Sequence, residues 1–498
     1  MSGIEAVTEN PNRLAERAIE AVNAGREAEV LPELAMALTH IRDNALLWQC
    51  AGLLHRALDQ HAEALVAFGH AARLAPDDAR IAHGRARVAL EAGIDAVALF
   101  AHARAFNPGD GSVHLGLAAA RFAVGDGIGA IDELDAVLAQ SPGWIEGHSG
   151  FLRLCAMMGE RARGTAAFDR ALAAQPRNAD LWRALILDLI TGERHDEAHA
   201  AIRRGRASIG DDPFFDANEA SILSEAGDVA SADLLFARVA HLGDEALVVR
   251  RVRHLLRNGR LDQALPVIEQ WIARPDASLI WPNAAIAWRM ADDPRWQWLE
   301  GDPQLVSVVD LADRLPELDR LASTLRDLHL ARAQPFDQSV RGGTQTDGQL
   351  FQRIDPIIQA LRGTIVTAIE AHIAQLPAID PAHPTLRHRR DRPPRFAGAW
   401  SVRLTGGGHH TNHVHPAGWI SSAFYVAVPS EGERGTGDAG WLTLGEPQAA
   451  LGLDLPPIRR IEPKPGRLVL FPSTMWHGTR PFDRDERLTV AFDVAPPR

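Results

Sequence analysis

The fold of the first part of the chain is decided by stretches such as Ala171-Leu172-Ala173-Ala174-Gln175-Pro176-Arg177-Asn178, in which an apolar helical run ends at a proline. The prolines of this series are Pro76, Pro108, Pro142, Pro176, Pro213 and Pro275. Half a repeat away stands a series of glycines, Gly93, Gly125, Gly159, Gly192, Gly227 and Gly259. Two series in step with one another predict, in each repeat, a helix, a tight turn, a second helix and a proline stop.

The repeat period, near 34 residues, resembles that of the tetratricopeptide repeat. About seven units are expected between residues 10 and 290, with the first and last degenerate in the manner of capping repeats. The resemblance implies that the helical repeats bind a protein or peptide partner. A scaffold or a dimerisation arm is the alternative.

Length, charge and cysteine content narrow the class of protein. The chain has 498 residues, enough for two or more domains, and its formal net charge of -12 argues against nucleic acid or an anionic membrane as the main partner. Cys50 and Cys155 lie far apart in apolar helical surroundings and are expected to be buried, reduced thiols. No stretch is apolar enough for a membrane span or a signal peptide, so a cytoplasmic location is expected.

The repeat pattern breaks after residue 290, and residues 291–335 are expected to connect the repeats to a second domain. An amphipathic helix over 316–333, with leucines at helical spacing, is expected to join the two parts. Beyond it come a polar, glycine-bearing loop at 338–346 and a helix near 355–376. The arginine-rich loop at 381–394 is either an electropositive rim or a solvated loop.

The hydrophobic period then changes to two, which is typical of strands. Short strands are expected around Trp400–Leu404 and over Trp419–Val428, Trp441–Leu444, Arg467–Phe471 and Arg487–Val494. Polar residues on one face of several short strands favour a jelly roll or a related double sheet. The predicted fold class is therefore α + β, with an all-α solenoid at 10–290, a connector at 291–335 and a β domain at 336–498.

Histidines cluster in His409-His410-Thr411-Asn412-His413-Val414-His415-Pro416, and a further one, His477, follows the apolar strand. Because strand side chains alternate, a His-x-His pair at a strand entry places both imidazoles on one side. His477, expected in a loop, could supply a third ligand. We predict a mononuclear metal site from His413, His415 and His477, with His409 and His410 as loop or supporting residues.

Arg487 opens an alternating strand on whose small face it stands with Thr489. A buried guanidinium needs an anionic partner, and a dicarboxylate co-substrate would supply one. The alternative is an ion pair with a neighbouring acid, Asp485 or Glu486. The chain's only tyrosine, Tyr425, shares a strand face with Ser421 and could bind the same carboxylate. We therefore expect Arg487, Tyr425, Thr489 and Ser421 to bind the co-substrate.

Residues from about 334 onward resemble the 2-oxoglutarate- and Fe(II)-dependent oxygenase superfamily, most closely a bacterial and phage branch related to prolyl hydroxylases. The motifs that carry the resemblance are Gln338–Thr346, His413-Val414-His415-Pro416, Trp419–Tyr425, Pro465–Ser473 and His477 followed by Arg487. The resemblance implies a double-stranded β-helix that couples decarboxylation of 2-oxoglutarate to hydroxylation of a substrate, with Fe(II), 2-oxoglutarate and O2.

By the same resemblance, His413 and His477 take the two histidine ligand positions, Arg487 binds the distal carboxylate of 2-oxoglutarate, and Tyr425 assists it. His415 stands where the superfamily commonly has an acid. It is either a third histidine ligand or no ligand at all. Two alternatives to this oxygenase remain open: a cupin-like dioxygenase with three histidines, and a repeat adaptor with an inactive C-terminal domain.

Overall fold

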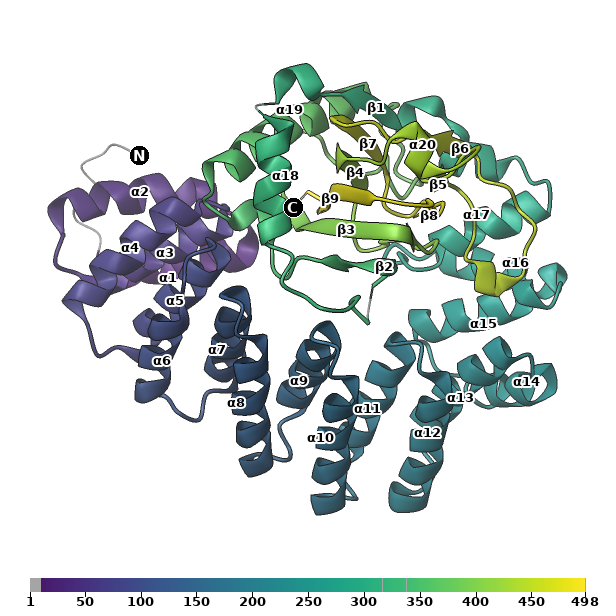
Figure 1. Cartoon of the computed structure of the whole chain (residues 1–498), viewed down its shortest axis with the longest axis horizontal. Helices are drawn as coiled ribbons and strands as arrows, with labels where there is room; N and C mark the ends of the chain where they lie inside the picture. The colour runs from purple at the N-terminus through teal and green to yellow at the C-terminus, as the bar shows by residue number, and fades with distance from the viewer. Residues whose placement is uncertain (1–9, 316, 337, 498) are drawn as a thin grey trace. The chain divides into compact units, whose positions relative to one another are not determined.

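The structure, a computed structural model, describes residues 10–315, 317–336 and 338–497 (Figure 1). Contacts group these residues into two compact units. One contains the residues up to Gln140 together with Asp347–Arg362, and the other contains Ser141–Thr346 and Gly363–Pro497. The metal site and all of its neighbours discussed below belong to the second unit. The three predicted domain ranges stay a prediction.

Sixteen of the described helices form eight consecutive pairs, one more than the seven units expected. They are α1 (Pro11–Ala24), α2 (Glu27–His40), α3 (Ala45–Ala57), α4 (His61–Leu74), α5 (Ala79–Glu91), α6 (Val97–Phe106), α7 (Gly111–Ala123), α8 (Gly127–Gln140), α9 (Ile145–Met157), α10 (Arg161–Ala174), α11 (Ala179–Thr191), α12 (His195–Ile209), α13 (Pro213–Ala226), α14 (Val229–Arg238), α15 (Glu245–Arg257) and α16 (Leu261–Ile272). The predicted solenoid is confirmed, and the prolines of the series lie between pairs or at a helix start.

The turn within each pair contains one residue in the left-handed backbone region. Five of the predicted glycines occupy it, but the sixth does not: Gly192 has φ -79° and Glu193 takes the turn at φ 57°. Gly25 and Asp59 hold the same position in the first two pairs, with φ 67° and 58°. These two turns lie outside the predicted glycine series, and one of them uses an aspartate, a residue that tolerates this region, in place of glycine.

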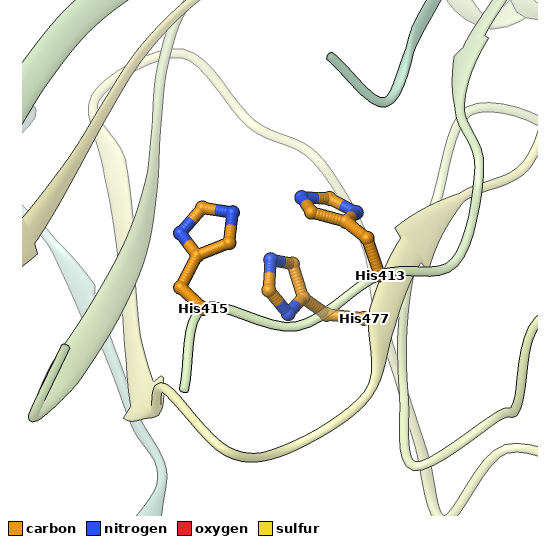
Figure 2. Close-up of side chains that lie close together, drawn as sticks. All are labelled: His413, His415 and His477. Atoms are coloured by element: carbon orange, nitrogen blue, oxygen red, sulfur yellow. The ribbon is translucent and has the colours of Figure 1, made fainter. Parts of the chain in front are cut away.

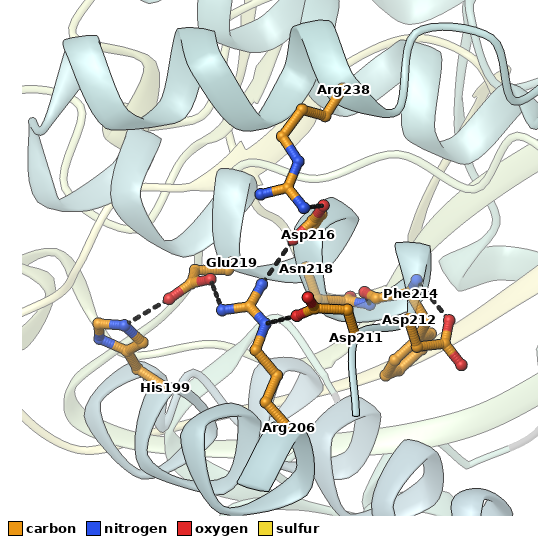
Figure 3. A network of polar contacts seen from close by, with 9 residues as sticks. All are labelled: His199, Arg206, Asp211, Asp212, Phe214, Asp216, Asn218, Glu219 and Arg238. Carbon is orange, nitrogen blue, oxygen red and sulfur yellow. Dashed lines mark hydrogen bonds and ion pairs between the residues drawn. The ribbon is translucent and has the colours of Figure 1, made fainter. Parts of the chain in front are cut away.

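Charged side chains of the later repeats are paired with one another (Figure 3). Arg206 on α12 binds Glu219 and Asp216 of α13, two acids that are buried. Asp216 also accepts from Arg238 of α14 at 3.0 Å, and Glu219 contacts His199 at 2.8 Å. Burial of these acids is tolerated because each has a cationic partner.

The β region consists of a six-stranded antiparallel sheet in the order β1-β7-β4-β9-β3-β2 and a three-stranded sheet in the order β6-β5-β8. The strands are β1 (Ser307–Asp310), β2 (Val340–Gln345), β3 (Phe396–His410), β4 (Ile420–Ala427), β5 (Leu442–Leu444), β6 (Arg459–Ile461), β7 (Arg467–Pro472), β8 (His477–Thr479) and β9 (Glu486–Val494). This double sheet confirms the predicted jelly-roll class.

Three parts of this region differ from the sequence-based expectation. Val340–Gln345, predicted to lie in a polar loop, forms the edge strand β2 against β3. His477 begins strand β8 and does not lie in a loop, because its backbone pairs with His413. Strand β1 lies within the predicted connector and pairs with β7, so this segment belongs to the sheet.

The joining helix is shorter than predicted. Pro316, its predicted first residue, lies outside the described residues, and α18 runs over Leu318–Asp327 with its apolar face against β4. It ends before Ala333 because the following residues have other partners. The His329 ring contacts Thr344 Oγ1 at 2.8 Å, and the amides of Arg332 and Ala333 donate to the Met157 carbonyl of α9.

Apart from short 3-10 and π helices, the remaining described helices are α17 (Trp281–Met290), α19 (Pro356–Gln375), which confirms the predicted helix near 355–376, and the short α20 (Glu431–Arg434). None of the described helices is both long and apolar enough to cross a membrane. Cys50 and Cys155 are buried, as predicted, and are not joined by a disulfide, and burial raises the pKa of the Cys50 thiol to about 11.

Candidate metal centre and co-substrate pocket

Three histidines converge at one end of the double sheet (Figure 2). One ring nitrogen from each of His413, His415 and His477 lies within 4.8 Å of the others. Two reciprocal backbone hydrogen bonds, of 2.9 and 3.0 Å, hold His413 opposite His477, and directly opposed residues of a ladder place their side chains together. The His415 amide donates to the Ser473 carbonyl, which brings the third ring to the same place.

Hydrogen bonds at Nδ1 fix the tautomer of each ring. His413 Nδ1 donates to the Thr411 carbonyl at 2.8 Å, and His477 Nδ1 donates to the Met475 carbonyl at 2.9 Å. A carbonyl only accepts, so the proton is on Nδ1 and the lone pair is on Nε2. His415 Nδ1 lies 2.7 Å from Asp493 Oδ2, which has the same effect. Imidazoles held in this way are typical metal ligands.

Burial disfavours the charged forms of His413 and His477. It lowers the pKa of His413 to about 3, with the charge of His415 acting in the same direction, and it lowers the pKa of His477 well below its usual value. Neutral imidazoles are the form that binds a metal ion. Three soft-to-borderline nitrogen donors without a protein carboxylate suit Fe, Zn or Cu better than Mg or Ca.

Asp493 of β9 supports the triad from behind His415. Its second carboxylate oxygen accepts from Ser421 Oγ at 2.6 Å, and Ser421 lies 2.9 Å from Ser473 Oγ. The structure thus places Ser421, a predicted co-substrate contact, on Asp493 and not among the residues that line the cavity beside the metal site. A carboxylate is therefore present at the site, but the imidazole ring of His415 stands between it and the metal position.

A cavity of about 50 Å³ opens beside the triad and is also lined by Tyr425, Arg487 and Thr489. Arg487 is 1% exposed; its Nη1 donates to the Gly440 carbonyl at 2.9 Å and its Nη2 to Thr479 Oγ1 at 2.7 Å. Arg487 Nε and the Tyr425 hydroxyl are buried without a hydrogen-bond partner among the described residues.

Among the ion pairs of the described residues none includes Arg487, so the alternative pairing with a neighbouring acid is not formed. Glu486 instead binds Arg326 and Arg403. Burial lowers the pKa of Arg487 and raises the pKa of Tyr425. An anionic ligand with two acceptor oxygens could bind both the buried Arg487 guanidinium and the Tyr425 hydroxyl.

His409 and His410 lie outside the triad. His410 Nδ1 contacts Ser339 Oγ at 3.0 Å, and the same hydroxyl is 3.2 Å from His413 Nε2. Thr479 and Asp493 are site residues that the sequence did not single out. Thr479 could have been found, since it follows His477 at strand spacing. The partnership of Asp493 with His415 depends on strand register and left no local signal.

Comparison with known proteins agrees with this arrangement. Residues 398–493 match a family model of oxidoreductases described as "Putative 2OG-Fe(II) oxygenase". No curated protein matches the chain. A C-terminal region of the 2-oxoglutarate/Fe(II) oxygenase type therefore follows an array of tetratricopeptide-type helix pairs.

Solved structures similar to the repeats include a tetratricopeptide repeat protein from Parabacteroides merdae, with 16% identity over 47% of this chain and 94% of that chain and a TM-score of 0.30. MamA from Desulfovibrio magneticus has 14% identity over 33% and 95% of the two chains and a TM-score of 0.30. YrrB, described as a repeat protein with an unusual peptide-binding site, has 17% identity over 36% and 96% and a TM-score of 0.29. The repeat assignment itself comes from the helix pairs of this chain.

Proposed function

We propose that the protein is a 2-oxoglutarate- and Fe(II)-dependent dioxygenase that hydroxylates a protein or peptide substrate. The observation that carries the proposal is that Arg487 and Tyr425, each with a buried polar atom that has no hydrogen-bond partner among the described residues, both line the cavity of the three histidines. A carboxylate between them would satisfy both. The cupin-like alternative gives this pair no partner, which is why we prefer the oxygenase.

Each group has a distinct part in this proposal. His413, His415 and His477 would hold Fe(II) through Nε2, with Asp493 orienting His415. Arg487 would bind the distal carboxylate of 2-oxoglutarate, and Tyr425 and Thr489 would line its position. When bound, Fe(II) with 2-oxoglutarate and O2 supplies the oxidation, with succinate and CO2 as co-products. The protein orients the co-substrate and excludes water from its carboxylate.

Binding tests the proposal without knowledge of the substrate. Mn(II) with 2-oxoglutarate should raise the melting temperature of the whole protein more than Mn(II) or 2-oxoglutarate alone, because a ligand of the native state stabilises it. Succinate formation with Fe(II) should depend on 2-oxoglutarate. If neither ligand raises the melting temperature, and an Arg487→Met variant melts and forms succinate no differently from wild type, the inactive adaptor is favoured.

Position 415 is tested separately. If His415 is a ligand, His415→Ala should lose most of the metal-dependent shift and His415→Asp should restore it, since an aspartate at this position would supply the more common ligand. Equal metal binding by wild type and His415→Ala would leave a centre with two histidine ligands.

A further inference from the structure

A second cleft, of about 670 Å³, lies within the same compact unit as the metal site. One wall comes from the repeats and contains Thr191, Glu193, His195, Glu225 and Arg253. The other wall comes from the oxygenase region and contains Arg341, His409–Asn412, Gln448–Ala450 and Thr479–Pro481. His410 and Thr479 line both this cleft and the cavity of the triad, so the two spaces lie next to each other.

Most charged groups in the cleft already have partners. Glu193 pairs with Arg341, and Glu225 pairs with His195 at 3.0 Å. Arg480 binds Glu446 at 3.0 Å. The charges of these groups are therefore already neutralised by partners within the protein, and they are poorly suited to bind a charged ligand.

Arg253 on α15 is different. Its guanidinium forms no hydrogen bond or ion pair with any described residue, and its Nε is buried. It lies 5.2 Å above the ring of Trp476, the residue before His477. The side chains of Thr191 and Gln448 in the same cleft also have no hydrogen-bond partner among the described residues. The charge of Glu225 acts on Arg253 from within the same cleft, but the Glu225 carboxylate is paired with His195 and forms no direct ion pair with Arg253. The repeats thus present one cation without a directly bound anion beside the proposed catalytic site.

We propose that this cleft holds an extended segment of a protein substrate, with an aspartate or glutamate side chain paired to Arg253. The proposal rests on the proposed function and adds the substrate class. Arg253 is half-buried and its guanidinium has no directly bound anion, and a carboxylate can bind such a group through two parallel hydrogen bonds. Because the cleft adjoins the metal cavity at His410 and Thr479, a chain bound in the cleft would lie beside the metal site.

The volume agrees with such an occupant. A cleft of about 670 Å³ falls within the roughly 300–1,000 Å³ of sites that enclose drug-sized ligands. A single small dicarboxylate would leave most of it to water. A peptide would place backbone groups near Thr191 and Gln448, and helical repeats commonly bind extended partners along their inner surfaces.

Peptide selection on the full-length protein, loaded with Mn(II) and 2-oxoglutarate, tests the proposal. The library consists of random peptides fused at both ends to fixed linkers, so that a free C-terminal carboxylate cannot bind Arg253 in place of a side chain. Wild type should enrich peptides with aspartate or glutamate at one position. Arg253→Gln should bind a selected peptide at least about tenfold more weakly, and Arg253→Glu should instead select lysine or arginine there. The charge-reversed selection also shows that this variant folds.

Arg251→Gln is the matched control, because Arg251 stands on the same helix, is half-buried and does not line the cleft. It should select the same peptides as wild type. The inference is overturned if no acidic preference appears, or if Arg253→Gln keeps it. A wild-type protein that responds to Mn(II) and 2-oxoglutarate but shows no acidic preference loses only this inference. A wild-type protein that shows no such response loses the proposed function as well.

Discussion

Substitutions of Tyr425 and Arg487 give the most direct test of the proposed co-substrate pocket. The Tyr425 hydroxyl is buried without a partner, so Tyr425→Phe removes an unsatisfied group and should leave the ligand-free protein as stable as wild type or more so. Its affinity for 2-oxoglutarate should fall about 5–10-fold, since a lost hydrogen bond is worth about 1–1.5 kcal/mol. Titration calorimetry of the Mn(II)-loaded protein and melting of the ligand-free protein measure the two effects.

The two effects of Tyr425→Phe have opposite signs, which separates a binding role from a structural one. A less stable ligand-free variant with unchanged affinity would mean that the hydroxyl supports the fold.

Arg487→Lys keeps the charge but loses the fork geometry, and it should weaken 2-oxoglutarate binding more than Tyr425→Phe does.

Asp493 supplies the second residue-scale prediction. Asp493→Asn keeps an oxygen acceptor for His415 Nδ1 at the same place but removes the charge. Metal affinity should fall about 10–100-fold, as is typical when the partner of a metal-binding histidine is changed. Competition with a coloured chelator measures it. Asp310→Asn, at an ion pair with Arg467 in the edge strand, should leave metal affinity unchanged; an equal loss in both variants would contradict a specific role.

At the scale of elements, the repeats depend on their left-handed turns. Gly125 has φ 87° with no atom within 4 Å of an added Cβ, so Gly125→Ala tests backbone conformation alone. It should destabilise the protein by about 1–2 kcal/mol. Gly109 has equal free space and no left-handed φ, and Gly109→Ala should be near neutral. Midpoints of urea unfolding compare them, and equal midpoints for the two variants would contradict the argument.

The same turns show how far sequence reasoning reaches. Repeat period and proline stops predicted the helix pairs because each mark acts locally on the backbone. At two turns the left-handed residue is not a predicted glycine: Asp59 holds one, and Glu193, next to the predicted Gly192, holds the other. The fold required a left-handed residue at these positions and not a particular amino acid. Strand β2 was missed for a related reason: its Gly-rich sequence has low strand propensity, and only pairing with β3 makes it a strand.

The sequence predicted which face of a strand a side chain lies on more reliably than which residue that side chain contacts. Alternation placed Arg487 and Thr489 on one side of β9, and both line the cavity. Ser421 was placed on the same side as Tyr425, yet it bonds Asp493. Period two gives the side of a sheet, but the neighbour on that side follows from register, which a single sequence does not encode locally.

At the scale of the whole molecule, the oxygenase region shares its core with helices from outside it. Trp476 and Leu451 belong to one cluster with buried residues of α15, α16 and α17. Trp476 Nε1 donates to the Pro282 carbonyl at 2.9 Å, and Arg289 Nη2 donates to the Pro456 carbonyl at 2.6 Å. The segment that positions His477 is therefore supported by the helices before it.

This shared core predicts that the β domain does not fold alone. A fragment of residues 336–498 would lose strand β1 and expose Trp476, and losing the packing of one buried tryptophan costs about 3–5 kcal/mol. Total stability of a domain is only about 5–15 kcal/mol. The fragment should therefore lack a fixed near-ultraviolet circular dichroism signal and bind no Co(II). A fragment of residues 245–498, which restores α15–α17 and β1, should regain both. Cooperative unfolding and metal binding by the shorter fragment would show instead that the sheet positions the three histidines without help from the helices.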